Sequence, residues 1–151
     1  MRDNMKRKLL KVMSVIVCLF MLSVCVNNVD AASTRYYSVL NQGVKTFKKS
    51  GRKLTVKTKK YYKIAYYKKN NMAKVKYVGY SKKFKLSKKC KYYWAAIAGY
   101  NRLYDKKYMK KTTFSNIKSS IIKARQYDSW EFRIVFVVKN GVVTKVLAVS
   151  A

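Results

Sequence analysis

Histidine and proline are absent from this chain of 151 residues, and acidic residues, glycine and cysteine are scarce. The lack of histidine excludes Ser-His-Asp and Cys-His catalysis and the usual histidine-containing zinc sites. The five glycines form no loop that could cradle a phosphate. Five Asp and Glu residues stand against 36 Lys and Arg residues, so carboxylates for catalysis or calcium binding are also in short supply.

The acids that follow residue 31 are Asp105, Asp128 and Glu131. Asp128 and Glu131 are close enough in sequence for an acid/base pair, but we expect a turn at Asp128 and an exposed Glu131 beside Arg133. A Ser-Lys dyad stays open because both residue types are abundant, although no serine lies in a glycine-rich elbow. We therefore expect a protein that is not an enzyme and holds no metal or cofactor.

The first 31 residues have the three parts of a secretory signal peptide. Residues 1–11 carry five bases and one acid, residues 12–26 carry no charge, and Val29 and Ala31 suit a cut before Ala32. The alternative is an uncleaved membrane anchor, but a spanning helix needs ~20 apolar residues. We expect removal of 1–31 near Ala31 and a secreted protein associated with the cell envelope.

The chain that follows the leader is strongly cationic. Five of the 36 bases and two of the five acids lie in 1–31, which leaves 31 bases, three acids and a net charge of +28. Residues 32–111 hold 25 of these bases, so we expect the basic surface there. Cys90 is the one cysteine after the leader. It is either a buried apolar residue, which we expect, or paired between chains.

Residues 32–42 are mixed in character and are expected to be a short lead-in to one β-rich domain over 43–151. Residues 44–49 and 52–57 predict a hairpin around Ser50-Gly51, with Phe47 opposite Leu54. Residues 59–71, KKYYKIAYYKKNN, predict a strand that returns over 72–80 through a two-residue loop at Asn70-Asn71. A loop of that length places Ile64 opposite Tyr77. A four-residue loop is the alternative, but it places like charges opposite each other.

In the predicted strand over 59–71, Tyr62, Ile64 and Tyr66 face the core, while Tyr61 and Tyr67 face solvent with Lys63. Residues 82–98 predict a further strand, broken near Ser87, in which Phe84 and Leu86 alternate with Lys83 and Lys85. Residues 99–111 predict a loop.

The last part of the chain predicts one helix and a hairpin. Thr112 and Thr113 are candidate N-caps of a helix that runs to about residue 126, because apolar residues follow at spacings of 3, 4 and 3. Residues 130–138 alternate as a strand, Asn140-Gly141 predicts a tight turn, and 142–150 predict the partner strand. The fold class is therefore mainly β (α+β), with one α-helix before the C-terminal hairpin.

The segments GVKTFKKSGRKLTVKT and VVKNGVVTKVLAV resemble the first hairpin and last strand of small secreted OB-like domains of unknown function in Gram-positive exported proteins. This resemblance implies an OB-like antiparallel barrel or sheet of five to seven strands, closed or open, and transfers no catalytic residues. The chain departs from the pattern through its extra lysines and its long 99–111 connection.

Lysines interleaved with tyrosines favour binding of an anionic polymer, because ammonium groups neutralise phosphates and aromatic rings stack on bases or sugars. The expected partners are teichoic acid, anionic membrane lipid or extracellular nucleic acid, with no small-molecule substrate. The alternatives are a membrane-active antimicrobial protein, which should release dye from vesicles, and a structural surface domain whose lysines only solvate it. The predicted binding face comprises Tyr61, Lys63, Tyr67, Lys74, Lys76, Lys83 and Lys85.

Overall fold

The computed structural model describes residues 33–97, 99, 101–127 and 131–150. The predicted leader and cleavage site, and Asp128 and Trp130, lie outside these residues. No helix within the described residues is long and apolar enough to cross a membrane.

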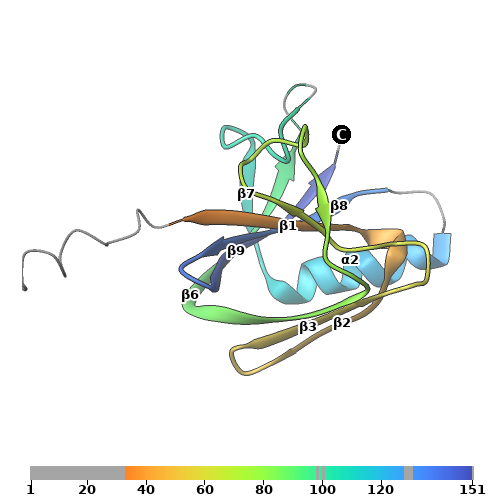
Figure 1. The fold of residues 1–151 in the computed structure, drawn as a ribbon. Coiled ribbons are helices and arrows are strands. Elements are labelled where there is room, and N and C mark those ends of the chain that lie inside the picture. Colours follow the sequence, from red (N-terminus) through yellow and green to blue (C-terminus); the bar gives the residue numbers. More distant parts are fainter. Residues whose placement is uncertain (1–32, 98, 100, 128–130, 151) are drawn as a thin grey trace, which may run out of the picture. The chain divides into compact units, whose positions relative to one another are not determined.

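The described chain is mainly β, with nine strands in one curled sheet and one long helix, so the predicted class is confirmed (Figure 1). The count exceeds the predicted five to seven strands. Along the sheet the order is β2-β3-β6-β9-β8-β1-β4-β5, and β7 pairs with β6. The elements are β1 Thr34–Leu40, η1 Asn41–Gly43, β2 Val44–Ser50, β3 Lys53–Thr58, β4 Ala65–Tyr67, β5 Lys76–Tyr77, β6 Ser81–Ala96, β7 Met109–Thr112, α2 Phe114–Tyr127, β8 Arg133–Lys139 and β9 Val142–Ser150.

The stretch predicted as a lead-in instead supplies β1, which lies between β8 and β4 in the sheet. All seven residues of β1 pair with β8. Its sequence TRYYSVL is rich in β-branched and aromatic residues, which favour a strand. The short η1 joins β1 directly to β2, so one bent stretch of chain pairs with β8 at one end and with β3 at the other.

Two of the predicted hairpins, β2–β3 and β8–β9, are present. Asn140 and Gly141 have φ values of 48° and 74°, the left-handed pair expected at a tight turn between β8 and β9. In the β2–β3 hairpin the turn is formed by Gly51-Arg52, with Gly51 at φ 53°, and not by Ser50-Gly51. Phe47 therefore pairs with Val56 and not with Leu54, which leaves the apolar faces unchanged.

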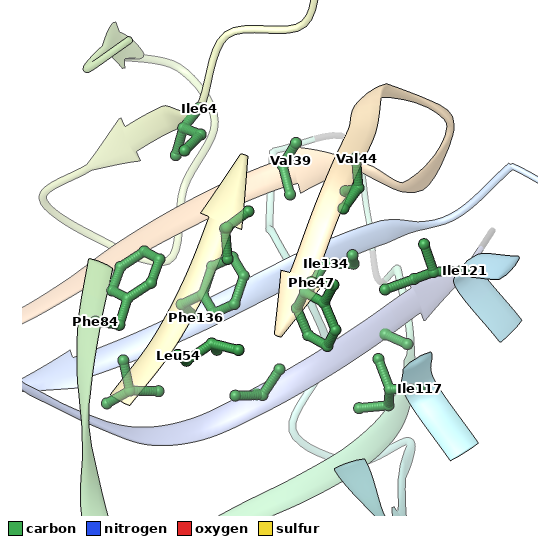
Figure 2. Packing of buried hydrophobic residues seen from close by; sticks show 14 of the residues in the cluster. Val39, Val44, Phe47, Leu54, Ile64, Phe84, Ile117, Ile121, Ile134 and Phe136 are labelled. Carbon is green, nitrogen blue, oxygen red and sulfur yellow. The ribbon is translucent and has the colours of Figure 1, made fainter. Parts of the chain in front are cut away.

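Helix α2 begins where the sequence predicts. The Thr113 hydroxyl accepts the backbone N–H of Asn116 at 3.2 Å, which is the expected N-cap bond. Ile117, Ile121 and Ala124 are buried against the sheet. Figure 2 shows Ile117 and Ile121 pointing from the helix into the core that contains Phe47. The predicted apolar stripe is therefore confirmed.

The sheet carries a hydrophobic cluster on each face. The larger one lies within the curl and includes Phe47, Leu54, Phe84 and Phe136 (Figure 2). The second includes Val135 and Val137 of β8 and, from outside the central strands, Leu103, Tyr104 and Tyr67. Strand β8 is therefore buried on both sides, whereas the sequence predicted one buried face.

Strand β6 is long and irregular, as predicted. Its parallel pairing with β9 shifts register between Leu86 and Lys91, and the Ser87 hydroxyl accepts the backbone N–H of Lys89 at 3.3 Å. Phe84 and Leu86 are buried while Lys83 and Lys85 are exposed, which confirms the predicted alternation.

The predicted hairpin over 59–80 is wrong in length and register. Only Ala65–Tyr67 and Lys76–Tyr77 form strands, and Ala65 pairs with Tyr77 where the sequence predicted Ile64 opposite Tyr77. This odd shift turns Tyr77 outward and Tyr67 inward. Because β4 also pairs with β1, its register is set from two sides.

Candidate functional site

The exposed lysines of β6 lie beside other bases on the neighbouring strand. In the β3–β6 pair, Lys85 is directly opposite Lys53, and Lys83 is opposite Thr55. On its other side Lys85 pairs with Val142, the first residue of β9. Like charges placed opposite each other on one sheet face repel. A bound anion between Lys53 and Lys85 would offset this repulsion.

Two hollows flank this part of β6, and both are lined by Lys83, Phe84 and Lys85. One hollow, of about 510 Å³, extends to the β2–β3 turn. The other, of about 320 Å³, extends to the β8–β9 turn and the start of β1. We call the two hollows together the β6 groove. Its lining comprises Ser33, Arg35, Tyr37, Ser50, Arg52, Lys53, Lys82, Lys83, Phe84, Lys85, Val138 and Gly141.

Arg52 is fixed at one end of the groove by two hydrogen bonds to the same residue. Its Nε donates to the backbone carbonyl of Leu86 at 3.0 Å, and the backbone N–H of Leu86 donates to the Arg52 carbonyl at 2.7 Å. The guanidinium is therefore held against β6. Such prior ordering reduces the side-chain entropy lost when an anion binds.

Tyr37 organises the opposite end. Its ring lies 5.3 Å from the Phe84 ring and 5.2 Å from the Tyr66 ring, and the Lys82 Nζ lies 4.6 Å from its centroid. Burial raises the pKa of Tyr37, Tyr66 raises it further, and Arg35 lowers it. The phenol therefore stays protonated at neutral pH and can donate a hydrogen bond. The ring also holds the Lys82 ammonium by a cation–π contact.

The charge of the β6 groove is of one sign. Six of its lining residues are basic, and none of the described residues that line it is acidic. The described acids are Asp105, whose carboxylate accepts the backbone N–H of Lys107, and the exposed Glu131. No group of three metal-ligating side chains occurs within the described residues. This arrangement suits attraction of anions by charge.

The structure separates the predicted binding face into three parts. Lys83 and Lys85 lie together in the β6 groove. Lys74 and Lys76 line a different hollow of about 540 Å³, bordered by Tyr66. Tyr61 and Lys63 line a third, of about 180 Å³.

The prediction that Tyr67 faces solvent is wrong. Tyr67 is only 5% exposed and packs in the second cluster, because the register of β4 turns it inward. The contact between Tyr66 and Tyr37 links the hollow at Lys74 and Lys76 to the β6 groove.

Sequence reasoning missed several residues of the β6 groove, namely Arg35, Tyr37, Arg52, Lys53 and Lys82. Arg52 and Lys53 could have been predicted from the β2–β3 hairpin. Residues at a turn that adjoins a central strand lie beside the exposed side chains of that strand. Arg35 and Tyr37 could not have been predicted, because their strand was expected to be a lead-in. No protein family, curated protein or solved structure matches the chain.

Proposed function

We propose that the protein is a secreted, non-catalytic domain that binds anionic polymers of the cell envelope along the β6 groove. The observation that carries the proposal is the convergence of six bases, without an acid, on two hollows that share Lys83, Phe84 and Lys85. The leader-like residues 1–31 support export.

The proposal includes an OB-like barrel. Its support is the strand path: β1-η1-β2 acts as one bent first strand, β3 and β6 follow, α2 comes before the last hairpin, and β6 runs parallel to β9. OB-fold proteins bind oligonucleotides and oligosaccharides on the face of their second and third strands, between the first and last hairpin loops. In this chain those elements are β3, β6 and the two turns that border the β6 groove.

Binding through lysines sets the character of the interaction. An ammonium group is a hydrated point charge without the fork geometry of a guanidinium. Four of the six basic residues in the groove are lysines, so affinity should follow the density of negative charge and not a sequence or a sugar. Each neutralised phosphate releases counterions, which makes binding strongly dependent on salt.

The test is retention on immobilised polyglycerol phosphate, DNA and heparin across a salt gradient. A Lys83→Gln/Lys85→Gln variant should elute earlier than the wild type, and on DNA the slope of log K against log salt should fall by about 2. The matched control is Lys118→Gln/Lys123→Gln, which removes the same charge from exposed positions on α2. Elution of the wild type at low salt from all three resins, or equal losses in both variants, would refute the proposal.

A further inference from the structure

Exposed apolar side chains gather in one short segment, residues 68–80. Among the described residues eight large hydrophobic side chains are exposed, and four of them lie within six consecutive positions. Their exposed fractions are 41% for Val75, 63% for Tyr77, 44% for Val78 and 42% for Tyr80. Isolated exposed apolar residues are ordinary, but a contiguous group indicates an interaction surface.

The same segment supplies four lysines to the lining of a largely apolar hollow. Ala73 and Val75 lie in the lining of the 540 Å³ hollow, with the Tyr66 ring beside them. Residues 59–80 contain no acid. Apolar side chains and cationic side chains therefore line the same hollow, and the exposed Tyr77 and Val78 follow Lys76 directly in the sequence. The lysines that line the hollow are Lys68, Lys69, Lys74 and Lys76.

The segment is held in this position by hydrogen bonds. The Asn70 side chain donates to the carbonyl of Tyr104 at 3.0 Å and accepts the backbone N–H of Leu103 at 3.1 Å. The backbone N–H of Met72 donates to the carbonyl of Asn101 at 2.8 Å. The backbone N–H of Val78 donates to the carbonyl of Ile64 at 2.9 Å. The exposure of the valines and tyrosines is thus built into the fold, because both ends of the segment are fixed.

The lysines, together with the exposed apolar side chains, distinguish between the possible binding partners of residues 68–80. A second copy of this chain, with a net charge of +28 after residue 31, would be repelled. A polymer of phosphates alone would leave Val75 and Val78 in water. An anionic bilayer offers phosphates above a hydrocarbon layer, and tyrosine is enriched at that boundary. The combination of Lys, Tyr and Val therefore matches the interface of an anionic membrane.

We propose that residues 68–80 dock on an anionic lipid surface, with Val75, Tyr77 and Val78 entering the headgroup boundary and the four lysines contacting lipid phosphates. This docking uses none of the residues that line the β6 groove. It leaves the groove's own lysines, Lys83 and Lys85, outside the contact, so that a polymer can be held while the protein rests on the membrane.

The experiment uses tryptophan reporters on the whole protein and vesicles of phosphatidylglycerol and phosphatidylcholine. The Val75→Trp variant should shift its emission to the blue and be quenched by brominated lipid, after subtraction of the wild-type emission. Ile122→Trp, which replaces an exposed residue on α2, is the matched control and should do neither. An unchanged emission of the Val75→Trp variant, or equal quenching of both variants, would overturn the proposal.

Binding measurements separate this surface from the β6 groove. Val75→Ser/Val78→Ser should weaken partition into the anionic vesicles about tenfold, because partition scales with the buried apolar area. Ile122→Ser should not change it. Adding Lys83→Gln/Lys85→Gln to the Val75→Trp variant should preserve the quenching by brominated lipid even if polymer retention is lost. Retention of the wild type on polyaspartate without any vesicle signal would overturn the lipid occupant in favour of an acidic protein.

Discussion

Replacement of Gly43 by alanine should destabilise the protein through one identified overlap. Gly43 is buried in η1, where β1 turns into β2, and its carbonyl accepts the backbone N–H of Lys59 at 2.8 Å. A Cβ at this position would overlap the Cβ, Cγ and Cδ1 atoms of Tyr62. Forcing an extra carbon into such a packed site typically costs 1–3 kcal/mol, so we expect Gly43→Ala to lower the free energy of unfolding by about 2 kcal/mol.

The loss of unfolding free energy caused by Gly43→Ala should depend on how much of the Tyr62 side chain remains. A Tyr62→Ala background removes the ring but keeps the Cβ, which itself overlaps the added methyl group, so the cost of Gly43→Ala should fall only to about 1 kcal/mol. A Tyr62→Gly background removes all three of these atoms, and the cost should nearly vanish. Urea unfolding followed by circular dichroism, with the m-value held constant, measures each free energy.

Gly51→Ala is the control for the comparison of Gly43→Ala across the three Tyr62 backgrounds. A Cβ at Gly51 meets no atom within 4 Å, but the residue has φ 53°. Its cost, about 1 kcal/mol for a left-handed alanine, should be the same in all three Tyr62 backgrounds. Equal costs of Gly43→Ala in the three backgrounds would refute steric overlap with Tyr62 as the cause.

Three further predictions concern stability. Asn41→Ala should cost about 2 kcal/mol in urea unfolding, because the buried Asn41 Oδ1 accepts the backbone N–H of Phe132 at 3.0 Å and the substitution removes this acceptor. Thr113→Ala should cost about 1 kcal/mol by the same measurement, and Thr113→Ser should restore it, because only the N-cap oxygen is needed. Burial raises the pKa of Tyr104 to about 12, whereas unfolded tyrosine loses its proton near pH 10. Tyr104 alone should therefore lower the free energy of unfolding by about 2 kcal/mol between pH 10 and 12, and Tyr104→Phe should remove this contribution.

The sequence predicted the elements whose formation depends on neighbouring residues. Asn140-Gly141 forms its turn because both residues take left-handed φ values, and Thr113 caps α2 within one helical turn. The alternation around Phe84 and Lys85 was readable for the same reason, since successive side chains of a strand take opposite faces. Because of this alternation, Lys83 and Lys85 of the predicted binding face lie together in the β6 groove.

The β6 groove as a whole depends on pairings between distant residues, which local patterns do not contain. Lys53 meets Lys85 because β3 pairs with β6, and Arg35 joins them because the sheet curls β1 back towards the same strand. The alternation along one strand predicts which of its side chains are exposed. It does not predict which exposed side chains of other strands lie next to them. One indication was present in β8, where five consecutive apolar residues from Ile134 to Val138 indicate a strand covered on both faces.

The predicted hairpin over 59–80 is wrong because Asn70 does not form the tight turn that its residue type suggested. An Asn-Asn pair between tyrosine-rich stretches predicts a tight turn, since asparagine tolerates a left-handed φ. In the structure the Asn70 amide instead bridges to Leu103 and Tyr104 of the connection before β7. That bridge lets the connection cover Val135 and Val137, and Tyr67 turns inward to complete the same cluster. The cover on the second face of β8 therefore fixes the register of β4, which in turn places Tyr77 and its neighbours at the surface.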